Sequence, residues 1–570
     1  MESHQWTEIE VDPTVVAAMQ TAGNLTRATA LSLAGRGVTK DTLEAFLRPT
    51  LKSMTNPYLL AGTEEAARRL WQAACQRERV LIHGDYDTDG VTAAVLVSQV
   101  LAENGVDSEI FLPHRVDDGY GLTVESIEKA GHSKFSLLVS VDCGITSPAA
   151  VAEARKQGLE VIITDHHEPG EQLPEECILI NPKLSGAPPA LRNLAGVGVA
   201  FKLCHAFIKY GREHGLGGLQ TDLRDYLDLV ALGTVADIVP LTDENRCLVR
   251  HGLPILARQR RPGIRALCEV AGLNGDQLGT GDIAFRLAPR INAPGRLDDA
   301  GLSMALLVAT SMAKAAPLAA QVNQSNLLRR QRENEVIALA ETQLADSGFN
   351  RESACIVVCG QDWHPGVLGI VAARLSRLHH RPAVVLANDH DGNLNGSVRS
   401  VPGLNVVEVL QETKSLLERY GGHAMAAGLS LKKEMLNAFR TAFEQNVKRL
   451  MSPQAFRPQL HFDGEIELRE LSEQFFAERQ LLEPFGHGNP EPMFLCRGIN
   501  PVWTAKAGQA HTRGAVCDHA ENTIDFIAFN RVPEELPKPP WNLAIRPQIN
   551  NFNGTCKSQV EIIDLRSAAP

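Results

Sequence analysis

Three aspartates stand at alternate positions directly after a short apolar run. Val80–Ile82 is followed by His83 and then by Asp85, Asp87 and Asp89. Carboxylates this close together repel one another at neutral pH unless a cation lies among them. The segment therefore predicts a strand that presents ligands for a divalent metal at its carboxyl end. An Asp-rich surface turn that merely starts the next helix is the alternative for this motif taken alone.

The same pattern occurs twice more along the chain. Leu137–Val141 precedes Asp142, and Val161–Thr164 precedes the run Asp165–His167. The ligand crevice of an open α/β sheet lies outside the carboxyl ends of its strands, so we expect these side chains to converge. A mixture of carboxylates and imidazoles suits Mn, Zn or Fe, and Mg less readily. The sequence thus predicts one metal centre served by several strand ends.

Apolar runs and amphipathic segments alternate on both sides of these motifs. Alternation of strands and helices at this spacing predicts a parallel, doubly wound α/β sheet. The expected strands begin at Arg79 and then cover Glu109–Leu112, Leu137–Val141, Val161–Thr164 and Ile178–Pro182, with helices over Val91–Leu101, Thr123–Ala130 and Pro148–Lys156.

The flanking segments predict further modules. A helix capped by Thr39 is expected to run to Phe46, and a long amphipathic helix is expected from Pro317, at its first position, to about Asp346. The cluster Arg329–Arg332 on that helix indicates a solvated face or a contact with phosphates. A second α/β domain follows from Cys355 to Leu450. The short strands near the end, at Thr523–Phe529, Leu543–Asn550 and Ser558–Ile563, predict a small β-barrel.

Length and composition narrow the class of protein. A chain of 570 residues is too long for one core and predicts three or four domains. Its 11 cysteines are scattered without a C-x-x-C pair, which argues against a disulfide framework or a structural zinc site. The first residues show neither the basic nor the apolar region of a leader peptide, and no apolar run approaches the ~18 residues of a membrane helix, so we expect a cytoplasmic protein without a membrane partner.

The net charge of −11 does not by itself favour a nucleic-acid partner. Local Lys and Arg side chains can nevertheless line a narrow path for a strand, and bound metals offset the carboxylates of a site. The glycines in Gly196–Phe201 are weak evidence for phosphate binding, because close helix packing explains them at least as well.

Several of these motifs resemble those of the DHH phosphoesterase superfamily. Asp165–His167 resembles the motif that names it, together with H-x-x-x-D-x-D at His83, Asp87 and Asp89. The segment 226–240 resembles the fourth motif of the superfamily, whose aspartate corresponds to Asp237 and is a metal ligand.

The second half of the chain narrows the resemblance. Gly396–Ser400 and Gly421–Leu429 resemble the DHHA1 domain. Asn292–Asp299, the length and the C-terminal tail resemble the RecJ family of single-strand-specific 5′ to 3′ DNA exonucleases. The resemblance covers the chain from about residue 30 to residue 565. It implies a helical N-terminal segment (1–70), a DHH domain (71–312), a connecting helix (313–350), a DHHA1 domain (351–450) and a C-terminal OB-fold β-barrel (455–570).

The resemblance and the residues together predict a two-metal hydrolase. Two ions ~3.5–4 Å apart activate a water and neutralise the charge that develops on a phosphodiester. We expect two Mn²⁺ or Mg²⁺ ions. Asp165 is either a ligand or a residue that orients a histidine. The expected metal ligands are Asp87, Asp89, Asp142, His166, His167 and Asp237, with His83 and Asp85 in reserve.

A second group of residues is expected to contact the strand. Arginine binds phosphate oxygens bidentately, which favours Arg115, Arg296 and Arg399 for this role, with a surface ion pair as the alternative for each. By resemblance, Ser397 and Arg399 face the metals across the cleft, and Arg296 assists catalysis. Further expected contacts are His423 for phosphate, and Tyr120, Phe526, Phe529 and Phe552 for base stacking.

The predicted function is a 5′ to 3′ single-stranded-DNA exonuclease that releases 5′-mononucleotides in DNA repair and recombination. The expected partners are single-stranded DNA with a 5′ end, and, by resemblance, a single-strand-binding protein and a RecQ-type helicase; the chain is expected to be a monomer. The first alternative is a DHH phosphoesterase that acts on short oligonucleotides, cyclic dinucleotides or pyrophosphate and shares every metal ligand. The second is a binding protein with an inactive nuclease fold.

Overall fold

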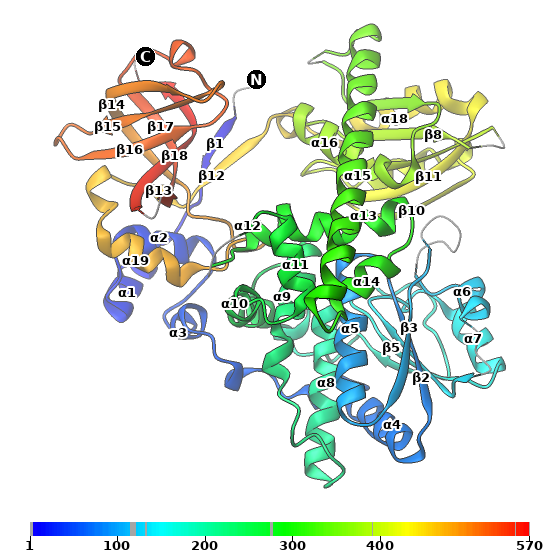
Figure 1. Ribbon diagram of the computed structural model, residues 1–570. Helices are drawn as coiled ribbons and strands as arrows, with labels where there is room; N and C mark the ends of the chain where they lie inside the picture. The colour runs from blue at the N-terminus through cyan, green and yellow to red at the C-terminus, as the bar shows by residue number, and fades with distance from the viewer. Residues whose placement is uncertain are drawn as a thin grey trace.

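The computed structural model describes residues 4–114, 121–130, 134–273, 277–350, 352–389, 392–552 and 555–568. Figure 1 shows three sheet-containing modules, the first two of which are joined by one long helix. In the part of the chain that the structure describes, no helix is both long enough and apolar enough to cross a membrane.

The first module is built on a parallel five-stranded sheet, as the alternating pattern predicts. The strand order is β3-β2-β4-β5-β6, so the chain reverses direction across the sheet between β2 and β4. β4 is buried along its whole length, which explains why its sequence is continuously apolar. The strands are β2 (Arg79–Gly84), β3 (Asp107–Phe111), β4 (Leu137–Val141), β5 (Glu160–Thr164) and β6 (Ile178–Ile180).

Helices cover both faces of this sheet. Alternate residues of each strand point to opposite sides: Ile82 and Val139 enter one hydrophobic core, whereas Leu81 and Leu138 enter the other. The larger core is covered by α4 (Thr63–Gln76), α5 (Thr88–Glu103), α8 (Gly196–Glu213) and α9 (Leu227–Ala236). The smaller core is covered by α6 (Val124–Lys129) and α7 (Pro148–Lys156).

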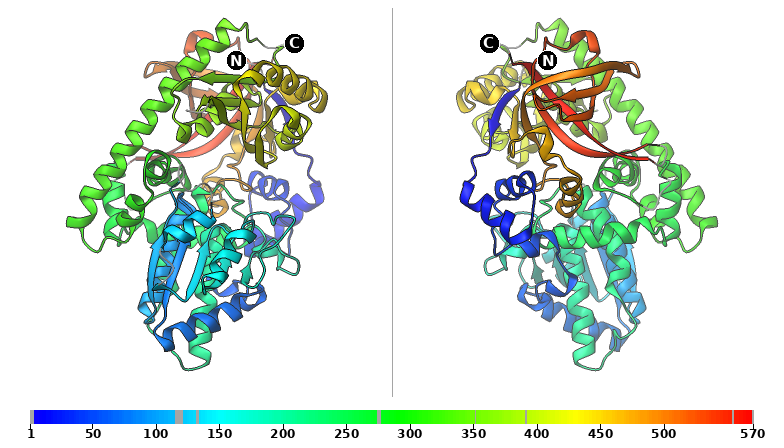
Figure 2. Two further views of the ribbon diagram at one scale, coloured as in Figure 1. Left: turned by 90° about the vertical axis from the view of Figure 1, so that its right-hand side faces the viewer. Right: turned by 90° about the vertical axis from the view of Figure 1, so that its left-hand side faces the viewer.

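The first module ends in a group of helices. The last of them, α15, runs from the first module to the second (Figure 2). The helices are α10 (Asp243–Ala257), α11 (Pro262–Val270), α13 (Ala288–Leu297), α14 (Gly301–Leu307) and α15 (Met312–Asp346). The helix predicted from Pro317 begins five residues earlier, because Ser311 supplies an extended residue before Met312, so the predicted start is wrong. Arg329 on α15 is buried and forms an ion pair with Glu333 at 2.9 Å, so it does not belong to a solvated face.

The second module is a mixed sheet in the order β10-β11-β9-β8-β7, in which β7 and β8 are parallel and the remaining pairs antiparallel. Its helices are α16 (Pro365–His379), α17 (Val406–Glu412) and α18 (Leu436–Leu450), and α15 contributes Ile337 and Ala340 to the core on the α16 face. The strands are β7 (Ile356–Gly360), β8 (Ala383–Asn388), β9 (Asn393–Arg399), β10 (Arg419–His423) and β11 (Ala426–Lys432).

The third module is the predicted β-barrel. Five strands follow the order β14-β15-β16-β18-β17, and pairing of β14 with β17 closes the barrel as in an OB-fold. They are β14 (Phe494–Ala507), β15 (His511–Cys517), β16 (Thr523–Ala528), β17 (Trp541–Phe552) and β18 (Thr555–Ser567), preceded by the short β13 (Gly464–Glu465) and by α19 (Glu473–Leu482).

The N-terminal segment belongs to the same hydrophobic core as this barrel. Met19 and Leu33 pack in one cluster with Phe475 and Phe494. Figure 1 shows the N-terminal helices beside α19. The elements are β1 (Gln5–Glu8), which pairs with β12 (Gln459–Phe462), α1 (Pro13–Gly23), α2 (Arg27–Gly35) and α3 (Leu43–Leu47). The helix predicted between Thr39 and Phe46 is therefore present, but it begins at Leu43.

A buried arginine joins the first module to this barrel module. Arg246 of α10 is 2% exposed and donates hydrogen bonds to the carbonyls of Phe46, Leu481 and Leu482 at 2.9–3.0 Å. Backbone carbonyls thus satisfy a charge that would otherwise be costly to bury.

Candidate metal centre

The predicted ligands converge at the carboxyl edge of the parallel sheet, where the strand order reverses between β2 and β4. The loops after β2, β4 and β5 bring their acids and histidines together with Asp237, which ends α9. Three sets of side chains could each hold a metal ion. Within a set, each residue offers one ligand atom, and these atoms all lie within 4.8 Å of one another. The sets are Asp142, His166 and His167; Asp89, His166 and Asp237; and Asp85, Asp87 and Asp142.

Several atoms of this cluster are buried without a hydrogen bond. Among the described residues, Asp142 Oδ1, His166 Nε2 and Asp237 Oδ2 have no hydrogen-bond partner. His166 Nε2 lies 3.2 Å from Asp142 Oδ1 and 3.6 Å from Asp237 Oδ2. A buried polar atom without a partner costs about 1–3 kcal/mol, and a cation between these atoms would satisfy all three at once. The donor set therefore fits a divalent metal.

The protonation of the cluster also suits a cation. Burial, and then the neighbouring Asp87, raise the pKa of Asp89 to about 7. Burial and the surrounding carboxylates raise the pKa values of Asp142 and Asp237 well above their ordinary range. Burial lowers the pKa of His166 to about 3, so this imidazole is neutral at pH 7 and keeps a lone pair for a metal.

Removing one charge from the cluster is therefore expected to stabilise the metal-free protein. Asp142 has φ 61°, a left-handed conformation that asparagine adopts readily, so Asp142→Asn keeps the shape of the site. We expect Asp142→Asn to raise the melting temperature in EDTA by roughly 2–4 °C, about 1 kcal/mol for a domain of ~200 residues. We also expect it to lose most of the further rise that Mn²⁺ gives the wild type.

Asp362→Asn is the matched control, because Asp362 is exposed and also left-handed, at φ 58°. Its melting temperatures should follow the wild type with and without Mn²⁺. An Asp142→Asn variant that melts lower than wild type in EDTA would show that the carboxylates of the cluster do not repel one another.

Backbone amides hold two of the predicted ligands in place. Asp87 caps α5 by accepting hydrogen bonds from the amides of Asp89 and Gly90 at 2.9 and 3.1 Å. Asp89 accepts hydrogen bonds from the amides of Gly196 and Val197, at 2.7 and 2.8 Å, where α8 begins. The positive end of the helix dipole favours this carboxylate.

These contacts also explain the glycine-rich start of α8, for which sequence reasoning left phosphate binding and helix packing open. A Cβ atom on Gly196 would lie 2.3 Å from Asp142 Oδ1. Glycine at this position thus lets the helix end approach both Asp89 and Asp142. Sequence reasoning missed this role, although the G-x-G pattern at the helix start was its signal.

Asp165 and His83 lie beside the three ligand sets. Asp165 accepts hydrogen bonds from the amide of Ile145 at 2.9 Å and from His167 Nδ1 at 2.7 Å. Burial acts to raise the pKa of Asp165, but the bond to His167 outweighs it and the pKa is lowered. His83 is fully buried, with Nε2 3.0 Å from Ser126 Oγ. This geometry favours an orienting role for Asp165 and a supporting one for His83.

Asn292 is a further residue that sequence reasoning did not assign to the site. Its Oδ1 accepts hydrogen bonds from both the amide and the hydroxyl of Thr88, each at 2.7 Å. Thr88 lies between the predicted ligands Asp87 and Asp89, so Asn292 fixes the loop that carries them. Its signal in the sequence was its place four residues before Arg296.

A series of close glycine contacts brings the second module to the metal edge. A Cβ on Gly295 would lie 2.7 Å from the carbonyl of Tyr86, and one on Gly366 would lie 1.9 Å from the carbonyl of Arg296. One turn further along α16, a Cβ on Gly369 would lie 2.8 Å from the guanidinium of Arg399 and 3.2 Å from Ser397 Oγ. Close contacts of small residues therefore connect Tyr86, which lies between the predicted ligands Asp85 and Asp87, to Arg296 and, through α16, to Arg399.

The remaining predicted contacts divide into three groups. Arg399 donates a hydrogen bond to Ser397 Oγ at 2.6 Å, and His423 is exposed at the end of β10. Phe529 is 48% exposed on the barrel, whereas Phe526 is 2% exposed in the barrel core, so Phe526 as a stacking residue is wrong. Arg115, Tyr120 and the side chain of Phe552 lie outside the described residues.

The parallel sheet, the ligand sets at its carboxyl edge and the arginine-bearing second module define a metal-dependent phosphoesterase of the DHH type. The family models agree: residues 79–234 match the N-terminal domain of the DHH family, residues 352–449 the DHHA1 domain and residues 462–564 the RecJ OB domain.

The chain belongs to the RecJ family of single-stranded-DNA-specific exonucleases. It is 37% identical to RecJ of Haemophilus influenzae over 90% of this chain and 92% of that protein. RecJ of Thermus thermophilus in complex with Mn²⁺ is similar in structure, with a TM-score of 0.84, 32% identity and coverage of 99% of this chain and 79% of that chain. The same protein in complex with Mg²⁺ has a TM-score of 0.79, 30% identity and coverage of 99% and 78%.

Proposed function

We propose that the chain is a metal-dependent exonuclease that hydrolyses single-stranded DNA from its 5′ end and releases 5′-mononucleotides. The observation that carries this proposal is the convergence of three ligand sets on one sheet edge, to which close glycine contacts connect Arg296 and Arg399. Membership of the RecJ family supports the choice of substrate. A role in DNA repair and recombination follows from the same membership.

We propose that two divalent ions, Mn²⁺ or Mg²⁺, are held by the three sets. Asp142 and His166 each belong to two of these sets. A carboxylate has two oxygens, so Asp142 could ligate both ions, whereas the single free ring nitrogen of His166 would ligate one. When bound, such ions polarise the phosphodiester and supply a hydroxide at neutral pH. RecJ of Thermus thermophilus contains either metal in its solved structures, which supports this choice.

The side chains of the site position the reaction. Asp165 fixes the ring of His167 through the hydrogen bond to Nδ1, which leaves Nε2 to face the cluster. The amides at the start of α8 orient Asp89. In the second module, Ser397 and Arg399 are proposed to bind a terminal phosphate, since the planar guanidinium matches phosphate oxygens. Binding a 5′ phosphate there defines which strand end enters.

The barrel is proposed to hold the strand further from the metals. Exposed aromatic side chains stack on bases, and Trp503 and Phe529 are 46% and 48% exposed on the barrel. Deleting the barrel would not test this role, because α1 and α2 share its core and would lose their packing. Point variants are the better experiment.

The double variant Trp503→Ala/Phe529→Ala is expected to weaken binding of long strands by at least about 30-fold, since each of the two stacked bases contributes about 1–3 kcal/mol. Cleavage of short oligonucleotides should change less than threefold. Fluorescence anisotropy on short and long strands, with cleavage assays on the same strands, measures both. Leu219→Ala removes another exposed apolar side chain, 78% exposed on the first module, and should change neither. An equal loss of binding and cleavage on short and long strands would instead indicate that Trp503 and Phe529 act at the metal centre.

The proposed function is tested by digesting a long 5′-phosphorylated single strand and a dinucleotide side by side in Mn²⁺. We expect the long strand to be degraded with much the higher efficiency. Preference for the dinucleotide, or for a cyclic dinucleotide, would make the chain a small-substrate phosphoesterase with the same metal ligands.

The remaining expectations rest on the family alone. We propose a cytoplasmic location, a monomeric state and cooperation with a single-strand-binding protein and a RecQ-type helicase. Cell fractionation, sizing in solution and co-purification test these three proposals in turn.

A further inference from the structure

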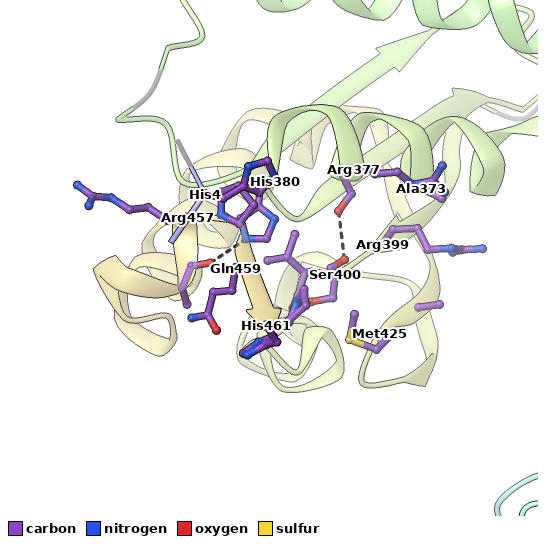
Figure 3. A pocket seen from close by; sticks show the side chains of 17 residues that line it. His4, Ala373, Arg377, His380, Arg399, Ser400, Met425, Arg457, Gln459 and His461 are labelled. Atoms are coloured by element: carbon purple, nitrogen blue, oxygen red, sulfur yellow. Dashed lines mark hydrogen bonds between the residues drawn. The ribbon is translucent and has the colours of Figure 1, made fainter. Parts of the chain in front are cut away.

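A basic cavity lies where the second module meets the segment that leads into the barrel (Figure 3). It has a volume of ≈ 990 Å³ and is formed by α16, the residues after β9, the β10–β11 turn, the segment 455–461 and His4. No Asp or Glu occurs among the described residues that line it. The basic side chains of the lining are His4, Arg377, His380, Arg399, Arg457 and His461.

The walls of the cavity are held together by contacts between distant parts of the chain. His380 Nε2 lies 3.1 Å from the carbonyl of Ala455, and Arg381 donates a hydrogen bond to the carbonyl of Phe456 at 2.9 Å. The amide of Gln5 bonds to the carbonyl of Pro458 at 2.8 Å. The cavity is thus a built feature of the fold.

Two of the arginines that line the cavity can present their positive charge to a ligand. Arg377 and Arg457 are exposed, and neither forms an ion pair with a carboxylate among the described residues. Figure 3 shows Arg399 and Arg457 extending to opposite sides of the cavity, with the histidines between them. Such an arrangement attracts anions.

The rest of the lining is apolar. Val401, Pro402, Met425 and Ala426 supply much of the surface between the basic groups. Ligand sites commonly have volumes of about 300–1,000 Å³ and combine apolar walls with a few polar groups that fix orientation. The arginines suit a phosphate group and the apolar wall suits a base, so the lining as a whole suits a nucleotide.

The cavity lies beyond Arg399 as seen from the metal centre. Gly366 of α16 contacts Arg296, and Gly369 contacts Arg399. Ala373 and Arg377 follow on the same helix and line the cavity. At 1.5 Å per residue, Arg377 lies about 16 Å along the helix from Gly366. One bound phosphate therefore does not reach both Arg296 and Arg377.

We propose that this cavity is a second nucleotide-binding site, which takes a 5′-phosphorylated nucleotide beyond the position where Ser397 and Arg399 hold the strand end. The identification of that ligand rests on the proposed exonuclease function. The nucleotide has two sources with the same chemistry: the product released at the metal centre, and the 5′ end of a strand that has moved past Arg399.

Binding of deoxyadenosine 5′-monophosphate in EDTA, measured by titration calorimetry, tests the site without any hydrolysis. We expect Arg377→Glu and Arg457→Glu each to weaken binding at least tenfold. Lys433→Glu, an equal change of charge at an exposed residue of the same domain outside the cavity, should stay within twofold of wild type. Equal affinity of the wild type and both arginine variants would overturn the proposal, as would loss of binding through Arg399→Ala alone.

Hydrolysis assays with the same variants distinguish the two sources. If the product occupies the cavity, added mononucleotide slows the wild type on a long strand but not Arg377→Glu. If the strand end occupies it, the wild type releases a minor fraction of di- and trinucleotides besides the main mononucleotide product, and this fraction is missing from the products of Arg377→Glu. Wild-type reactions that show neither effect would overturn the proposal. Nucleotide binding in EDTA persists even if the exonuclease assignment fails, so the two failures are separable.

Discussion

Replacing Asp89 with alanine is expected to lower the hydrolysis of single-stranded DNA at least a thousandfold, which corresponds to about 4 kcal/mol of transition-state stabilisation. Asp89 belongs to the ligand set that also contains His166 and Asp237, and its carboxylate is buried against the start of α8. Its loss removes a ligand from the metal centre and is not compensated elsewhere. His166→Ala should have an effect of the same size, because His166 is shared by two sets.

Two further variants separate chemistry from folding. Asp89→Ala leaves the amides of Gly196 and Val197 without an acceptor, whereas Asp89→Asn removes the charge and keeps an acceptor for one of the two amides. Both should be inactive, and Asp89→Asn should fold as well as wild type by circular dichroism. More than a few per cent of wild-type turnover in Mn²⁺, in preparations free of contaminating nuclease, would show that Asp89 is not a metal ligand.

The second large effect is expected from Arg399. Removing a charge-assisted hydrogen bond from a desolvated site costs about 2–5 kcal/mol, so Arg399→Ala should lower kcat/KM by tens- to several thousandfold. The decrease should fall mainly on strands with a 5′ phosphate, since the guanidinium is bonded to Ser397 in a position that suits a terminal phosphate. Strands with a 5′ hydroxyl lack that partner and should be affected much less.

Arg399→Lys provides the matched control for charge. Lysine keeps the positive charge but loses the planar pair of donors, so part of the activity should return. Rates on 5′-phosphorylated and 5′-hydroxyl strands, each short and long, complete the comparison. A decrease that depends on strand length and ignores the 5′ phosphate would place the terminal phosphate elsewhere and give Arg399 a role along the strand.

Much of the metal centre follows from local sequence patterns. The runs before Asp85, Asp142 and Asp165 are buried strands of a parallel sheet, and such strands end at one common edge. Their periodicity is therefore enough to predict that these acids and histidines converge. Asp237 is the exception, because it ends α9 and was predicted as a ligand from the resemblance alone.

Other features depend on contacts between residues far apart in the chain, which periodicity does not encode. The packing of Met19 against the barrel joins the two ends of the sequence, and no local pattern predicts it. Gly366 and Gly369 must be small because they lie against Arg296 and Arg399, which belong to other elements. The start of α15 at Met312 was missed because a proline five residues inside a helix looks like a first position.

The central claim is that one metal centre degrades single-stranded DNA from its 5′ end. The most direct test follows a single strand that carries one label at its 5′ end or one at its 3′ end, digested in Mn²⁺ by the wild type and by Asp89→Asn. The account predicts that the 5′ label appears as mononucleotide from the first time point, that the 3′ label stays in progressively shorter strands, and that Asp89→Asn releases neither. Release of the 3′ label first, or undiminished release by Asp89→Asn, would contradict it.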